Sequence, residues 1–227
     1  MIGQDFYMKF LTNLRRPKTE AHGATLFYFQ IMAVVAITGD IGAGKSTASK
    51  FLAEKFSCPL LNADLIAAEL WHDEKVKNIF ISRWGKKILD MSGNIIKSEI
   101  SQRIFFDINE YKFCNSILHP IINEELGIRY EKLRVKNKNI ILEIPLIFEA
   151  GVPDFVEKII YVAADFDIRA KRCFVQRGWS VDELKRRESF LMPREKKISL
   201  SDYVIENNNG LEELKKELEE KLLTPNS

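Results

Sequence analysis

Hydrophobic residues fall into two kinds of stretch along this chain: short unbroken runs, and longer segments with helical spacing. The first run, residues 33–38, contains adjacent valines and an isoleucine, as expected of a strand that is buried on both faces. Four more apolar runs occur at residues 58–62, 139–149, 158–165 and 202–207. Helix-like segments separate most of these runs, and this alternation predicts a parallel five-stranded sheet wrapped by helices.

The longest helical segment, residues 73–131, is interrupted by a turn signal around Gly93. It separates the first two strands from the third, and we interpret it as a helical substrate-binding insertion rather than a second independent domain. Residues 166–199 also have helical spacing, with a break at Gly178. The last helix is expected over residues 211–223, where a leucine stripe indicates core packing rather than a coiled coil.

A glycine-rich segment stands between the first predicted strand and the helix that follows it. It fits the pattern Gly-x-x-x-x-Gly-Lys-Ser without a mismatch. Glycines let the backbone turn tightly and expose a concave row of N–H groups, to which the helix adds its positive dipole end. Lys45 is expected to reach the β- and γ-phosphates, and the Ser46 hydroxyl to ligate Mg²⁺. The pattern predicts a nucleoside triphosphate site at Gly39, Asp40, Ile41, Gly42, Ala43, Gly44, Lys45, Ser46 and Thr47.

Composition narrows the class of protein. The 227 residues are 46% hydrophobic, which is enough for a sizeable core in one domain. The net charge is +2, and residues 1–31 carry this excess, so the rest of the chain is balanced. A nucleic-acid-binding face usually has a basic excess, so we expect no nucleic-acid partner. The three cysteines are widely spaced and suit a reducing cytoplasm rather than a disulfide framework or a zinc site.

We expect either that the start is mis-assigned and Met32 is the functional start, or that residues 1–31 are a poorly ordered N-terminal extension. Met32 immediately precedes the strand with which phosphate-loop domains commonly begin. The apolar stretch 26–37 is too short to span a bilayer, so no membrane association is expected. This stretch runs into the glycine-rich loop where a secretory signal would need a small-residue cleavage site.

A phosphate loop alone does not separate kinases, GTPase switches and motor ATPases. A GTPase would need Asp-x-x-Gly after a strand and a guanine-reading Asn-Lys-x-Asp. Residues 90–93 match the first by letters but lie in a predicted turn with helical flanks. Residues 137–140 lack the final aspartate of the second. The GTPase interpretation is therefore weakened.

Six segments, in order from about Val34 to Gly210, resemble the dephospho-coenzyme A kinase family. They are ITGDIGAGKST, NADLIAAEL, GNIIKSEISQRIFFD with LHPII, EIPLIFEAG, RCFVQRGWS and MPREKKISLSDYVIENNNG. Apart from the loop, each segment is weak evidence when taken alone. Their occurrence in the right order is specific.

The resemblance implies a three-layer P-loop nucleoside-triphosphate-hydrolase-like fold over residues 32–227, with a lid at about residues 172–192. It implies that ATP phosphorylates the ribose 3′-hydroxyl of dephospho-coenzyme A to give coenzyme A and ADP, the final step of coenzyme A biosynthesis. ATP and dephospho-coenzyme A are then the partners and Mg²⁺ is the cofactor. The protein is expected to be a monomer or a weak homo-oligomer.

The resemblance also assigns roles to residues, beside the loop lysine. Asp64 is implied as the base that contacts the acceptor hydroxyl, although it could instead cap a helix. Arg172 and Arg177 are implied to close over the ATP phosphates, or else are solvated surface arginines. His119 is either a substrate contact or a packed residue at a helix joint. Glu143 either orients the metal or serves packing and hydrogen bonding.

Three positions depart from the family pattern, namely Asn62 for an aspartate, Lys97 for an arginine and Leu191 for a glutamine. None of them removes the loop lysine, the candidate base or the lid arginines. Two other functions stay open on the residues alone. One is another small-molecule or nucleotide kinase of the same fold, and the other is an ATP-binding regulatory module without transfer chemistry.

Overall fold

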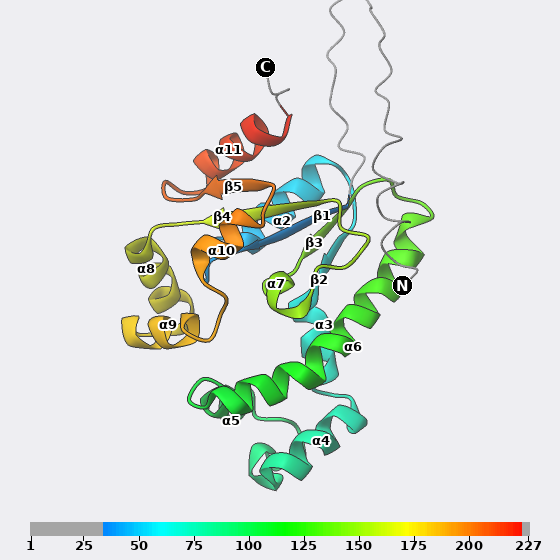
Figure 1. Cartoon of the computed structure of the whole chain (residues 1–227), viewed down its shortest axis with the longest axis vertical. Coiled ribbons are helices and arrows are strands. Elements are labelled where there is room, and N and C mark those ends of the chain that lie inside the picture. The colour runs from blue at the N-terminus through cyan, green and yellow to red at the C-terminus, as the bar shows by residue number, and fades with distance from the viewer. Residues whose placement is uncertain (1–33, 224–227) are drawn as a thin grey trace, which may run out of the picture.

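The computed structural model describes residues 34–223, and the expectation for residues 1–31 lies outside them. The described chain forms one five-stranded sheet in which all neighbours are parallel, in the order β2-β3-β1-β4-β5 (Figure 1). The strands are β1 (Val34–Gly39), β2 (Leu60–Asn62), β3 (Ile140–Glu143), β4 (Lys158–Ala163) and β5 (Tyr203–Glu206). The predicted parallel five-stranded sheet is confirmed.

Side chains of the central strand β1 alternate between two apolar layers because successive residues of a strand point to opposite faces. Val35 and Ile37 pack against α2 (Lys45–Lys55) and α11 (Leu211–Leu223). Val34 and Ala36 pack against α3 (Ala63–Leu70), α6 (Ile108–Arg134) and α7 (Ile147–Ala150). Both faces of the sheet are therefore covered, which gives the expected three-layer α/β/α arrangement.

The predicted helical block consists of α4 (Glu74–Trp84), the 3-10 turn η1 (Lys86–Ile88), α5 (Lys97–Ile104) and most of α6. It has an apolar cluster of its own, with Phe80 and Ile88 fully buried at its centre. The long helix α6 carries this block away from the sheet, and α4 and α5 lie at the far end of α6 (Figure 1). The turn expected near Gly93 separates η1 from α5, and Gly93 itself has a positive φ of 80°.

The third strand ends earlier than the apolar pattern indicates. β3 ends at Glu143, whereas the run of apolar residues was expected to stay a strand to about Glu149. Ile144 still donates to the carbonyl of Ile37, but Pro145 has no N–H to continue the ladder. The chain therefore turns at Pro145 and continues as the short helix α7.

The segment expected to form the lid, residues 172–192, contains the second half of α8 (Phe166–Arg177) and all of α9 (Val181–Glu188). Gly178 ends α8 with a φ of +68°, and the Ser180 hydroxyl accepts from the Glu183 N–H at 3.1 Å to cap α9. Helix α10 (Arg194–Ser199) then leads to β5. Within residues 34–223, no helix combines the length and the apolar character that a bilayer span requires.

Candidate active site

The glycine-rich loop connects β1 to α2 at the carboxyl edge of the sheet, where parallel-sheet proteins place their ligand sites. Gly39, Gly42 and Gly44 have φ values of +146°, +77° and +99°, which side chains rarely tolerate. A Cβ at Gly39 would stand 2.1 Å from the carbonyl oxygen of Val162 in the neighbouring strand. The first glycine is therefore required by close backbone packing as well as by conformation.

Lys45 is the first residue of α2, and its side chain turns back over the loop. Its ammonium donates to the carbonyl oxygens of Gly39 at 3.2 Å and Asp40 at 2.9 Å. Desolvation lowers the pKa of Lys45 to about 8, although the nearby Asp64 and Glu143 carboxylates act in the opposite direction. The ammonium is thus enclosed beside the loop while most of it stays protonated at neutral pH.

Glu143, at the end of β3, is a buried carboxylate with three side-chain donors. Ser46 Oγ donates to its Oε1 at 2.5 Å, Ser49 Oγ donates to Oε2 at 3.1 Å, and Asn62 Nδ2 donates to Oε2 at 2.9 Å. These donors come from α2 and from the end of β2, so the carboxylate joins the phosphate loop to the neighbouring strand. A buried carboxylate needs such partners because its desolvation is otherwise costly.

Asp64 lies at the second position of α3, next to the end of β2. It does not cap the helix, because Asn62 does: the Asn62 side-chain oxygen accepts from the N–H groups of Asp64 at 2.8 Å and Leu65 at 3.2 Å. The Asp64 side chain is open to solvent on the side of a cavity, but the surrounding protein still desolvates it. This desolvation raises the pKa of Asp64, while Lys45 opposes the shift.

Lys45 and Asp64 line a common cavity of about 390 Å³ beside the phosphate loop. Most residues of the predicted nucleotide site line it, as do Glu143 and both predicted lid arginines, whereas Gly39, Asp40 and Ala43 do not. The full lining is Ile41, Gly42, Gly44, Lys45, Ser46, Thr47, Asp64, Glu143, Pro145, Arg172, Gln176, Arg177, Asn207, Gly210, Leu211 and Leu214. The fold therefore brings the loop lysine, the candidate base and the two arginines to one place.

The two arginines project from α8 in different ways. Arg172 is half-buried, and its guanidinium lies 3.5 Å from the carbonyl oxygens of Gly42 and Ala43, with burial lowering its pKa. Arg177 is exposed and stacks on the ring of Trp179 at 4.8 Å. Neither arginine forms an ion pair with a carboxylate of the described chain, so both charges remain available to an anion.

The comparisons with known proteins agree with this geometry. Residues 33–213 match the family model described as dephospho-CoA kinase. The chain belongs to the dephospho-CoA kinase family. A dephospho-CoA kinase of Fusobacterium nucleatum is 34% identical over 189 residues, which cover 82% of this chain and 95% of that protein.

Solved structures support the fold. The structure of TT1252 from Thermus thermophilus is similar, with a TM-score of 0.69 and 28% identity over 85% of this chain and 98% of that one. A dephospho-CoA kinase from Campylobacter jejuni has a TM-score of 0.58 at 24% identity, and the match covers 81% of this chain and 92% of that one. The second likeness concerns the fold alone. Both share the sheet and helical layers expected of a phosphate-loop kinase.

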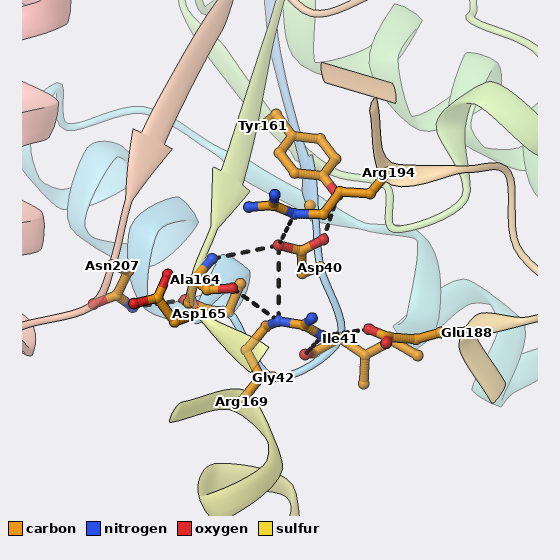
Figure 2. Close-up of polar contacts among 12 residues, drawn as sticks. Asp40, Ile41, Gly42, Tyr161, Ala164, Asp165, Arg169, Glu188, Arg194 and Asn207 are labelled. Carbon is orange, nitrogen blue, oxygen red and sulfur yellow. Dashed lines mark hydrogen bonds and ion pairs between the residues drawn. The ribbon is translucent and has the colours of Figure 1, made fainter. Parts of the chain in front are cut away.

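Four predicted site residues of this family member do not line this cavity, namely Gly39, Asp40, Ala43 and His119, and the side chains of His119 and Asp40 have other surroundings. His119 lies inside α6, immediately before Pro120, and its Nε2 is buried with no hydrogen-bond partner among the described residues. Burial lowers the pKa of His119, because desolvation disfavours the charged imidazolium. The Asp40 carboxylate contacts Tyr161 and Arg194 (Figure 2), and Asp40 does not line the nucleotide cavity. A substrate contact by His119 stays a prediction, while the Asp40 side chain has protein partners.

Asn207 is a cavity residue that sequence reasoning missed. Its amide donates to the carbonyl oxygen of Ala43 at 2.6 Å and so holds the phosphate loop from the end of β5. A Cβ at Gly44 would stand 2.4 Å from this amide nitrogen. Its position directly after a predicted strand was an available signal, because strand ends meet at the same edge of a parallel sheet.

The donor set suits a hard cation. Ser46 and Glu143 present oxygen atoms in direct contact beside Lys45, and the described residues hold no cluster of three or more His, Cys, Asp or Glu side chains that would form a closed metal site. Mg²⁺ is usually bound by one or two protein oxygens together with substrate phosphates and water. The residues of this family member fit that mode of binding.

Proposed function

We propose that this protein transfers the γ-phosphoryl group of ATP to the ribose 3′-hydroxyl of dephospho-coenzyme A, giving coenzyme A and ADP. The observation that carries the proposal is the convergence of Lys45, Asp64 and the lid arginines on one cavity at the phosphate loop. Family membership supplies the acceptor, and the geometry supplies groups with suitable chemistry for phosphoryl transfer.

Each group of the cavity has a defined task in this reaction. The glycine-rich loop and the amino end of α2 provide N–H groups for the phosphates, and Lys45 adds a positive charge close to them. Arg172 and Arg177 neutralise charge that spreads over the transferring group in the transition state. The enzyme therefore acts mainly by positioning and charge stabilisation.

Asp64 is the acceptor for the hydroxyl proton. Asp64 lines the same cavity as the loop and does not cap the helix, so its carboxylate is available to the acceptor hydroxyl. A raised pKa makes a carboxylate a stronger base, and desolvation at this place acts in that direction. Proton transfer to Asp64 leaves the 3′-oxygen free to attack phosphorus.

Mg²⁺ would be held by the Ser46 hydroxyl, with Glu143 fixing that hydroxyl through their 2.5 Å contact. When bound, the ion supplies charge neutralisation to the β- and γ-phosphate oxygens. The protein's own contribution is to orient Ser46 from α2 and to keep Glu143 in place with Ser49 and Asn62.

Room for the rest of the acceptor exists next to the nucleotide cavity. A second cavity of about 950 Å³ lies between α5 and α9, lined by Lys97, Ser98, Glu99, Ser101, Gln102, Arg103, Phe106, Trp179, Glu183, Arg186 and Arg187. Trp179 lines this cavity and stacks on Arg177, which lines the first. The acceptor carries a diphosphate and a long pantetheine arm, and the arginines and lysine of this cavity suit the diphosphate.

The decisive experiment measures ADP formation by the purified protein with Mg²⁺-ATP and either dephospho-coenzyme A, AMP or no acceptor. We expect ADP above background only with dephospho-coenzyme A, together with a product of coenzyme A mass. ADP formation with AMP instead would move the protein to the nucleotide kinases. ATP binding without acceptor-dependent ADP would favour the regulatory module.

A further inference from the structure

The Asp40 carboxylate accepts hydrogen bonds from residues of several elements, and these donors do not line the nucleotide cavity. Tyr161 Oη donates to Oδ1 at 2.5 Å, while the Ala164 N–H at 3.3 Å and Arg194 Nε at 3.1 Å donate to Oδ2 (Figure 2). Arg169 Nε lies 3.8 Å from the same oxygen. Asp40 is 7% exposed, so these partners replace water almost completely.

Arg169, in α8, links Asp40 to the lid helices. Its side chain is buried, and it donates to the carbonyl oxygens of Ala164 at 2.9 Å and Ile41 at 3.3 Å. Its other end forms an ion pair with Glu188, the last residue of α9. The start of α8 and the end of α9 are thus tied to one guanidinium, which is tied to Asp40 (Figure 2).

Helix α10, which follows the lid in the chain, also contacts Asp40. Arg194, its first residue, reaches Asp40, and Lys197, one turn further on, forms a buried ion pair of 2.6 Å with Glu149 in α7. The lid helices are therefore fixed at both ends of their segment. The guanidinium groups of Arg169 and Arg194 face the carboxylates of Asp40 and Glu188, so two positive charges balance two negative charges.

Both lid arginines lie on the same helix as Arg169, further from its base. Arg172 is one turn beyond Arg169 on α8, and Arg177 is the last residue of that helix. At 1.5 Å per residue, Arg177 is about 12 Å beyond Arg169, so a 10° tilt of α8 about its base would move it by about 2 Å. Displacements of about 1 Å in a catalytic group can reduce rates by about 100-fold.

We propose that the Asp40 carboxylate is a positioning residue for phosphoryl transfer, which sets the angle at which α8 holds Arg172 and Arg177 over the phosphate loop. This inference rests on the proposed function, because it assumes that those arginines act on the transferring group. The side chain faces the base of the lid, and residue 40 is not among the residues lining the nucleotide cavity. Its removal should therefore lower kcat while leaving the affinity for ATP nearly unchanged.

The first test is Asp40→Asn, which preserves the size of the side chain and the backbone of the loop. The substituted amide keeps one oxygen that can accept from Arg194, but it removes the negative charge that faces Arg194 and Arg169. We expect kcat to fall by about 10- to 100-fold with dephospho-coenzyme A, and KM for ATP to change by less than about 3-fold. Glu131→Gln is the matched control, because Glu131 is an exposed carboxylate of α6 whose ion-pair partner within residues 34–223 is the surface residue Arg134.

Glu188→Gln removes the lid carboxylate that pairs with Arg169 and changes no residue of the phosphate loop. It should lower kcat in the same direction, and the double variant with Asp40→Asn should lose less than the product of the two separate effects. Effects that multiply independently would contradict a common pathway through Arg169.

The position of the lid can be measured directly at Trp179, which lies between α8 and α9. The chain has three tryptophans, so a protein labelled with 5-fluorotryptophan should give three fluorine resonances, with Trp179 assigned by Trp179→Phe. In Asp40→Asn we expect the Trp179 resonance to move while those of Trp71 and Trp84 stay in place. A merely structural role would move all three or none.

The proposal is overturned if Asp40→Asn keeps a wild-type kcat and Trp179 signal. It is also overturned if a lower kcat accompanies a general loss of folding in which all three resonances change. If the wild-type protein transfers no phosphoryl group, the proposed function fails instead. In that case the Trp179 resonance still reports whether Asp40 sets the position of the lid.

Discussion

The pKa of Lys45 predicts a fall in catalytic efficiency on the alkaline side of neutrality. An ammonium with a pKa of about 8 is protonated to about nine-tenths at pH 7, half at pH 8 and one-tenth at pH 9. The protonated form is the one that attracts phosphate. We therefore expect kcat/KM for ATP, which reports the free enzyme, to decrease as pH rises through about 8.

The size of the decrease follows from the contact that is lost. A hydrogen bond to a charged group contributes about 1.5–3 kcal/mol, which corresponds to about 10- to 150-fold in kcat/KM. The profile should therefore fall about tenfold for each pH unit above 8 and then level off at the activity of the neutral amine. Dissociation constants for ATP measured over the same pH range should show the same midpoint.

Lys45→Arg provides the control for this profile. Arginine stays protonated up to about pH 12, so the variant should lose activity at every pH yet show no alkaline decrease with a midpoint near 8. A wild-type profile that is flat from pH 7 to 10 would refute the reasoning. So would a variant that retains the wild-type midpoint, because another group would then be titrating.

Asp64→Asn should lower kcat by about 100-fold or more and leave the ATP dissociation constant within a few-fold of the wild-type value. Single-turnover rates measure the first effect and ATP titrations the second. Turnover at the wild-type rate would exclude Asp64 as the base. Glu143→Gln should raise the Mg²⁺ concentration for half-maximal ADP formation by about tenfold or more, and an unchanged requirement would separate Glu143 from the metal site. Gly39→Ala should prevent stable folding, because its Cβ would meet the Val162 carbonyl at 2.1 Å. Gly210→Ala meets no atom within 4 Å and should cost only about 1–2 kcal/mol of conformational strain in thermal unfolding; equal losses would exclude the close contact as the reason for Gly39.

Local patterns were sufficient for much of the fold. Apolar runs predicted the strands, most directly β1 and β3, which are buried along their whole length and need apolar residues on both faces. The edge strand β5 is only partly buried. The predicted end of the third strand was wrong, because an apolar run does not distinguish a strand from the buried side of a short helix such as α7. Pro145 was the signal against a continued strand, because it lacks the N–H that the ladder requires.

The nucleotide loop was predictable for a different reason, namely that its residues are adjacent in sequence. The network behind it was not, because Asp40 is 121 residues from Tyr161 and 154 residues from Arg194. The sequence around a charged residue that follows a strand does not show which distant residue will be its partner. The same holds for Glu143, whose hydrogen bonds with Ser46 and Asn62 show only once β3 lies between β1 and β2.

The lysine and the candidate base are electrostatically linked, and this link allows the two role assignments to be tested against each other. Asp64 is the largest of the influences that keep the pKa of Lys45 from falling further, and Lys45 in turn limits the rise in the pKa of Asp64. Removing the charge in Asp64→Asn should therefore shift the Lys45 midpoint below pH 8.

Because this variant turns over slowly, the shift is best read from ATP dissociation constants as a function of pH. A midpoint that moves down shows that the two groups share one site, as simultaneous contact with phosphate and acceptor hydroxyl requires. A midpoint that stays near 8 would mean that Asp64 is too well screened from Lys45 to face the same transferring group. The base would then have to be sought elsewhere in the cavity, even if kcat had fallen.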